Sequence, residues 1–165
     1  MSYYVGPILV FLFALVEVSV LPMFRVSGLQ PNLVLVLLVA WLTLRGAQEA
    51  FVLTAVGGVS LGLVEGTAIG TALIALAPIA LLQEVRGAQL REGGIILTTL
   101  FVVLMTFTYQ LTYFAVFAIG GHSGDAMQAL SRVIIPTAFL NVVVLLPIYA
   151  VLSLSSQETR RVGYV

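Results

Sequence analysis

The stretch from Ala50 to Gln83 is the part of the chain that most restricts its fold. It contains 34 residues, and Glu65 is its only charged side chain. A single helix of that length would be about 50 Å long, whereas the hydrocarbon core of a lipid bilayer is about 30 Å thick. The stretch must therefore turn back on itself. We expect the reversal at residues 64–67, which read VEGT, because a carboxylate and a glycine coincide there.

The composition indicates an integral membrane protein. Hydrophobic residues make up 61% of the 165 positions and charged residues 8%, and the mean hydropathy is +1.15. A soluble domain is nearer 45 to 50% apolar and about 25% charged. The seven basic residues balance seven acidic ones, so there is no excess charge to attract nucleic acid. The absence of cysteine excludes disulfides, thiolate metal sites and a cysteine nucleophile.

Apolar runs separated by short polar segments predict six membrane-spanning helices in one all-α domain covering residues 1–165. Pro31 suits the first position of the second helix. The third and fourth helices form a tight, glycine-rich hairpin, and a polar loop follows at 83–94. Pro147 lies inside the last helix, where we expect a kink. The predicted spans are residues 4–24, 31–44, 50–64, 67–83, 95–119 and 133–154.

The distribution of arginine predicts the orientation, because cytoplasmic loops carry the excess of positive charge. With the amino terminus inside, five arginines lie on the cytoplasmic side and two on the outer side. Both termini are therefore predicted to be cytoplasmic. The inner arginines are Arg45, Arg86, Arg91, Arg160 and Arg161, and the outer ones are Arg25 and Arg132.

Polar side chains inside the spans predict a buried cluster. Helical rise places Glu17, Gln110 and Asn141 at similar depth in the outer half of the membrane, and Thr106, Gln110 and Tyr113 share one helix face. We therefore expect these five residues to join the first, fifth and sixth spans, because a carboxylate in hydrocarbon needs a partner. The alternative is a protonated Glu17 bonded to the backbone of its own helix.

Small residues recur at intervals of four along the predicted hairpin. Such stripes let helix backbones approach closely in lipid. Internal packing of the hairpin is one interpretation, and dimerisation or docking of a partner is the other. The stripe consists of Ala50, Thr54, Gly58 and Gly62 on the third span and Gly66 and Gly70 on the fourth.

The sequence offers no motif for catalysis or cofactor binding. His122 is the single histidine, so it lacks the companions that a metal site requires. The glycine-rich stretch lacks the ending and the strand context of a phosphate-binding loop, and no nucleophile lies near a base in sequence. We therefore expect a protein that is not an enzyme and holds no cofactor or metal.

Five segments follow one another along the chain: PNLVLVLLVAW, LRG, GLVEG, AIG and FLNVVVLLPIY. Their order resembles that in the MreD family of rod-shape-determining proteins, and the resemblance covers nearly the whole chain. Asn32 and Glu65 stand where aspartate is commoner in the family, and both keep a polar group. The matching positions are Pro31, Asn32, Leu33, Arg45, Gly46, Gly58, Gly62, Leu63, Glu65, Gly70, Asn141 and Pro147.

This resemblance implies a non-enzymatic adaptor of the cell-elongation machinery in the bacterial cytoplasmic membrane. It would bind MreC, a protein with one membrane span, within a larger complex that includes RodA, a transpeptidase, MreB and RodZ. The family is thought to share its six-helix fold with the substrate-binding subunits of energy-coupling-factor transporters, so a vitamin-uptake subunit is the alternative. Partner binding is favoured, because few convergent polar groups are available for a small ligand.

Overall fold

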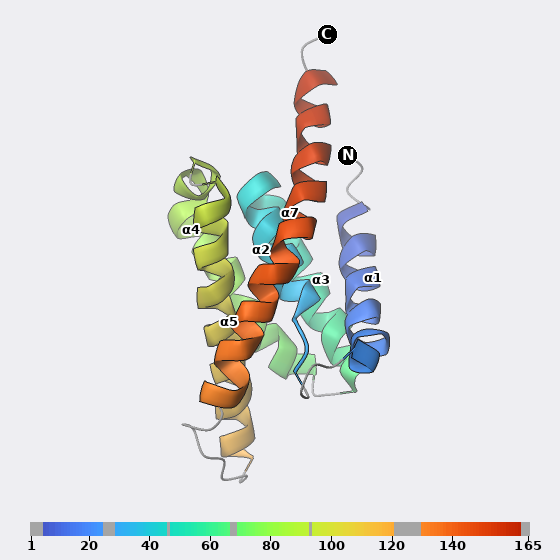
Figure 1. The fold of residues 1–165 in the computed structure, drawn as a ribbon, viewed down its shortest axis with the longest axis vertical. Coiled ribbons are helices and arrows are strands. Elements are labelled where there is room, and N and C mark those ends of the chain that lie inside the picture. Colours follow the sequence, from blue (N-terminus) through green and yellow to red (C-terminus); the bar gives the residue numbers. More distant parts are fainter. Residues whose placement is uncertain are drawn as a thin grey trace.

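The computed structural model describes residues 5–24, 29–45, 47–66, 69–92, 94–120 and 130–162, and helices account for nearly all of them (Figure 1). The predicted all-α class is confirmed. Successive helices run in alternating directions, so that α1 begins and α7 ends at the same end of the molecule. The α-helices are α1 (Val5–Ser19), α2 (Leu33–Arg45), α3 (Ala47–Glu65), α4 (Ile69–Glu92), α5 (Gly94–Ile119) and α7 (Ile135–Val162), with a 3-10 turn at Leu21–Phe24 and a π-helical turn at Leu130–Ile134.

The predicted reversal between the third and fourth helices is confirmed. Helix α3 ends at Glu65 and α4 begins at Ile69. Gly66 between them has a φ of 66°, a left-handed conformation that glycine adopts without steric cost. The two helices pack along each other as an antiparallel hairpin.

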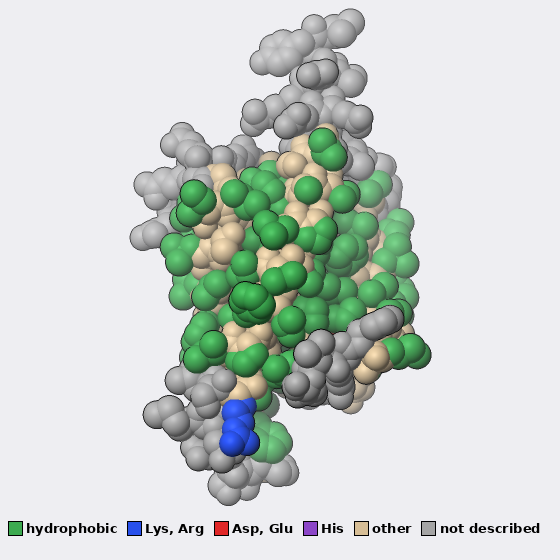
Figure 2. Space-filling model, viewed as in Figure 1, with side chains coloured by type: hydrophobic (Ala, Val, Ile, Leu, Met, Phe, Trp, Pro, Cys, Tyr) green, Lys and Arg blue, Asp and Glu red, His purple; other side chains and the backbone are tan. Residues whose placement is uncertain are grey.

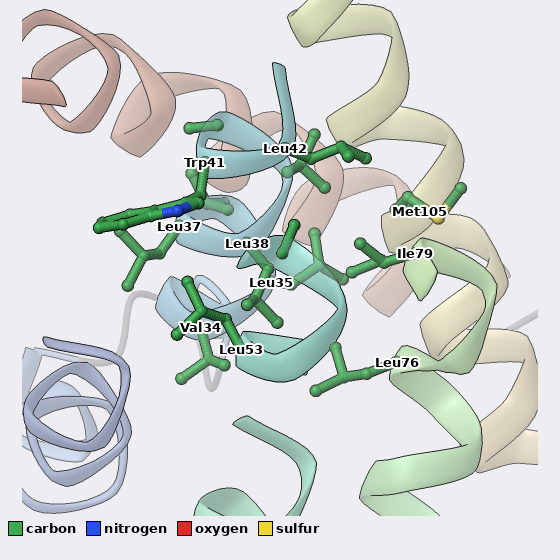
Figure 3. Close-up of a cluster of buried hydrophobic side chains, with 14 of the residues drawn as sticks. Val34, Leu35, Leu37, Leu38, Trp41, Leu42, Leu53, Leu76, Ile79 and Met105 are labelled. Carbon is green, nitrogen blue, oxygen red and sulfur yellow. The ribbon is translucent and has the colours of Figure 1, made fainter. Parts of the chain in front are cut away.

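Helix α2 is the centre of the fold, since it contacts all five other α-helices. Ten consecutive side chains, from Val34 to Thr43, are buried. A helix that is apolar on every side is stable only when other elements surround it. Figure 3 shows α2 side chains meeting Leu53 of α3, Ile79 of α4 and Met105 of α5.

The outer surface is apolar, whereas several polar side chains are buried. Figure 2 shows hydrophobic side chains, drawn in green, over the visible face, with basic side-chain atoms, drawn in blue, at one end. Ile96, Leu100 and Phe139 are more than half exposed, whereas Glu17, Asn32 and Asn141 are buried. An apolar surface that covers buried polar side chains is unlike that of a water-soluble domain, and it matches a protein whose solvent is lipid.

Three described segments have the length and composition needed to cross a membrane: Val5–Met23, Gly94–Ile119 and Arg132–Leu154. Two apolar stretches are shorter, at Leu33–Arg45 and Gly70–Leu81. The chain thus has the character of a membrane protein, while six crossings and their orientation stay predictions.

Several predicted boundaries were wrong. Helix α2 begins at Leu33, after Pro31, because Asn32 caps it. Helix α3 already begins at Ala47. The loop predicted at 83–94 is mostly helical, since α4 continues to Glu92. The glutamine, glutamate, arginine and alanine residues in this segment favour a helix, so a run of polar residues does not by itself end a helix.

Candidate functional site at the amino end of the central helix

The amino end of α2 lies inside the protein, which creates a demand for hydrogen-bond acceptors. The first backbone N–H groups of a helix have no partner within the helix, and leaving one unpaired away from water is costly. Asn32 meets part of this demand as the N-cap. Its side-chain oxygen Oδ1 accepts a hydrogen bond from the N–H of Leu35 at 2.8 Å, and its carbonyl accepts one from Val36 at 3.2 Å.

Glu17 of α1 supplies a second acceptor to the same helix end. Its side chain is 4% exposed, and Oε2 accepts a hydrogen bond from the N–H of Val34 at 3.0 Å. An oxygen acceptor is favoured at this position because the first N–H groups of a helix have no partner within the helix. The alternative in which Glu17 bonds to the backbone of its own helix is wrong in its partner, because the backbone N–H that it binds belongs to α2.

Asn141 connects this helix end to the last helix. The N–H of Asn32 donates to Oδ1 of Asn141 at 2.7 Å, across 109 positions of sequence. The other side-chain atom, Nδ2, donates to Oγ1 of Thr106 on α5 at 2.8 Å. The Thr106 hydroxyl in turn donates to the carbonyl of Val102 at 2.7 Å. We call Glu17, Asn32, Thr106 and Asn141 the α2 amino-end network, and it joins α1, α2, α5 and α7.

Two of the five residues predicted for this cluster lie outside the α2 amino-end network. The Tyr113 hydroxyl donates to Oε2 of Glu65 at 3.2 Å, which ties α5 to the tip of the α3–α4 hairpin. Its ring lies 4.8 Å from that of Tyr109, a buried side chain that the sequence reasoning missed. Gln110 is half-buried, and no hydrogen bond within the described residues ties it to the network.

The carboxyl end of α2 carries a complementary charge. Arg45 is the last residue of the helix, and its guanidinium lies 4.6 Å from the centre of the Trp41 ring. The indole Nε1 of Trp41 donates to Oε2 of Glu49 on α3 at 3.1 Å. A cation at this end complements the helix dipole. Acidic and basic side chains therefore stand at the amino and carboxyl ends of the central helix, respectively.

Within α3, the stripe of small residues faces the interior. Ala50, Thr54, Gly58 and Gly62 are all buried. A Cβ on Gly58 would lie 2.7 Å from Cδ2 and 2.9 Å from Cα of Leu73 on α4. This contact requires glycine, and it favours internal packing of the hairpin over partner docking for this part of the stripe.

The α4 part of the stripe does not pack in this way. Gly70 is exposed, and a Cβ there would meet nothing within 4 Å. Gly66 forms the turn. Sequence reasoning also missed Gly57, where a Cβ would lie 3.0 Å from Cγ1 of Val34 on α2.

The remaining positions of the family pattern are scattered over the fold. Pro31 and Leu33 flank the cap and are half-buried, Leu63 is 62% exposed, and Pro147 is exposed inside α7. Gly46 and His122 lie outside the described residues.

Among the described residues, no group of three or more histidine, aspartate or glutamate side chains could hold a metal ion. Comparisons of the chain with protein-family models, with curated proteins and with solved structures gave no match.

Proposed function

We propose that this protein is a multi-pass adaptor of the MreD type in the bacterial cytoplasmic membrane. Its six helices cross the membrane with both termini in the cytoplasm, and it acts by binding other membrane proteins without catalysing a reaction. The partner is a single-span protein of the MreC type, within a complex that also contains RodA, a transpeptidase, MreB and RodZ.

The observation that carries this proposal is the hydrogen bond between Asn32 and Asn141. These residues occupy two separate positions of the family pattern, one opening the second helix and one in the last helix, and they bond directly at 2.7 Å. Most positions of the family pattern are glycine, leucine or proline, which are common in any membrane helix. The polar positions Asn32 and Asn141 are more informative, because both bind at the buried amino end of α2. Pro31 and Leu33, which also belong to the family pattern, lie directly before and after Asn32.

The alternative of a vitamin-binding subunit receives less support. A ligand site needs convergent polar groups that are available to the ligand. In the α2 amino-end network, Asn32, Asn141 and Thr106 bond to one another, and Glu17 bonds to the backbone of α2. These groups are used to hold the fold together, which favours binding through the outer, lipid-facing surfaces.

Co-purification tests the proposed function. The tagged protein is extracted in mild detergent from its host membrane, and the proteins and small molecules retained with it are identified by mass spectrometry. We expect a one-span protein with a coiled-coil domain, retained in stoichiometric amount. An unrelated six-span protein with the same tag is the control. Recovery of ATPase subunits or of a vitamin would contradict the adaptor function and favour the transporter alternative.

A further inference from the structure

The neighbouring helix α5 extends beyond the tip of the α3–α4 hairpin. Glu65, the last residue of α3, accepts a hydrogen bond from the hydroxyl of Tyr113 on α5. This bond places the hairpin tip near the level of Tyr113. Helix α5 continues for six more residues to Ile119, which adds about 9 Å at 1.5 Å per residue. Figure 1 shows the end of α5 extending beyond the turn between α3 and α4.

The extending part of α5 has the surface of a lipid-facing helix. Val116, Phe117 and Ile119 are 38%, 54% and 86% exposed, respectively. Exposing such side chains to water costs about 25 cal/mol for each Å² of apolar surface. This end of α5 therefore belongs inside the hydrocarbon.

The tip of the α3–α4 hairpin is unfavourable inside the hydrocarbon that covers the end of α5. A flat membrane surface that covers Ile119 would leave Glu65 and the exposed Gly66 turn about 9 Å below it. A carboxylate and a non-helical backbone turn are both unfavourable in lipid. The exposed apolar side chains of α3 lie between Phe51 and Leu63, a distance of about 18 Å in a hydrocarbon core about 30 Å thick.

We propose that the protein thins the bilayer locally, so that one membrane surface dips toward the tip of the α3–α4 hairpin. Lipid headgroups and water then reach Glu65 and Gly66, while the end of α5 stays covered by lipid. Short hydrophobic segments are known to be accommodated by bilayer thinning. This inference rests on the crossings of α3 and α4 proposed above, and its partner is the lipid itself.

Spin-label depth measurements test the dip with a matched pair of positions. Leu63 lies two residues before Glu65, and Leu111 lies two residues before Tyr113. Helices α3 and α5 run in the same direction (Figure 1), so the Glu65–Tyr113 bond places the two positions at similar levels. Both side chains are exposed, at 62% and 53%. The chain contains no cysteine, so Leu63→Cys and Leu111→Cys each provide a single labelling site in the full-length protein.

The labelled variants are reconstituted in long-chain phosphatidylcholine vesicles, and collision with oxygen and with a water-soluble nickel chelate is measured. We expect nickel accessibility to be several-fold higher at Leu63→Cys than at Leu111→Cys, and the difference to shrink in short-chain lipid. Equal depths at the two positions would overturn the proposal, as would low accessibility of Leu63→Cys to both reagents, which indicates a protein contact on the hairpin.

A failure of the proposed topology gives a different result. If α3 and α4 do not cross the membrane, the nickel chelate reaches the labels at Phe51→Cys and Leu63→Cys from the same side of the vesicle. If they cross, the two labels are reached from opposite sides of the vesicle. Circular dichroism and gel filtration confirm that each labelled variant keeps the fold of the parent protein.

Discussion

At the scale of single residues, Glu17 and Asn32 share one task on α2. The Glu17 carboxylate accepts the N–H of Val34, and the Asn32 side chain accepts the N–H of Leu35. Two successive backbone donors of a buried helix end are thereby paired. A carboxylate that looks costly in an apolar helix is thus explained by the backbone that it faces.

Substitution of Glu17 tests this explanation. Glu17→Gln keeps an oxygen acceptor for Val34 N–H, so we expect it to assemble normally with little change in stability. Glu17→Leu leaves that donor unpaired, which costs about 1 to 3 kcal/mol. The midpoint of thermal unfolding in detergent is the measurement. Equal midpoints for Gln and Leu would show that the hydrogen bond contributes nothing.

The bond between Asn141 and Thr106 is tested by a double-mutant cycle. Asn141→Leu removes both the acceptor for Asn32 and the donor to Thr106, whereas Thr106→Val removes only the hydroxyl. Hydrogen bonds between membrane helices contribute about 0.6 kcal/mol on average and up to about 1.7. We expect coupling within that range, from unfolding in detergent mixtures. Additive effects would contradict direct coupling.

Sequence reasoning placed Glu17, Gln110 and Asn141 at a common depth from helical rise, and it added Thr106 because this residue shares a helix face with Gln110. The structure brings Glu17, Asn141 and Thr106 to the amino end of α2, whereas Gln110 lies outside the network. The sequence did not identify the amino end of α2 as their shared partner, because every residue except proline has a backbone N–H group and the sequence does not show which of these groups are left unpaired. The remaining clue was the asparagine directly before ten apolar residues, which is an N-cap signal. Tyr113 was misplaced because a shared helix face does not determine which neighbour a long side chain reaches.

At the scale of elements, the α3–α4 hairpin depends on one close backbone approach. A Cβ at Gly58 would come within 2.9 Å of the Cα of Leu73, an atom that cannot move without shifting the helix. Gly70, on the other helix of the hairpin, has open space around it. The same residue type therefore has two different roles within one sequence stripe.

This contrast provides a matched pair of substitutions. Gly58→Ala should force α3 and α4 apart, and overpacking of this kind costs about 1 to 3 kcal/mol. Gly70→Ala should be neutral or slightly stabilising, since alanine is favoured over glycine in a helix by about 1 kcal/mol. Thermal unfolding of both variants in detergent is the measurement. Greater destabilisation by Gly70→Ala would contradict the packing described here.

The hairpin was predictable because an apolar run of 34 residues must turn back and contains one place to do so. The end of α4 was not predictable, since the residues after Gln83 are polar but still favour helix. Polarity marks where a chain leaves lipid, whereas a helix ends where capping or glycine ends it. Span boundaries and helix boundaries are therefore different quantities in this chain.

At the scale of the whole molecule, the helices alternate in direction around α2, so α1 begins and α7 ends at the same end of the bundle. That arrangement is compatible with both termini on one side of the membrane. It does not by itself distinguish the cytoplasmic side from the outer side. The arginine distribution makes that choice, with five arginines toward the proposed cytoplasm and two toward the outside.

Cysteine labelling in intact cells tests the orientation. Met23, at the end of the first apolar segment, is 82% exposed and lies on the proposed outer side. Gln89 lies beyond the apolar part of α4, on the proposed cytoplasmic side. We expect an impermeant maleimide to label Met23→Cys in intact cells, and to label Gln89→Cys only after the membrane is opened. Labelling of Gln89→Cys in intact cells would invert the orientation, and the amino end of α2 would then lie toward the cytoplasmic side of the membrane.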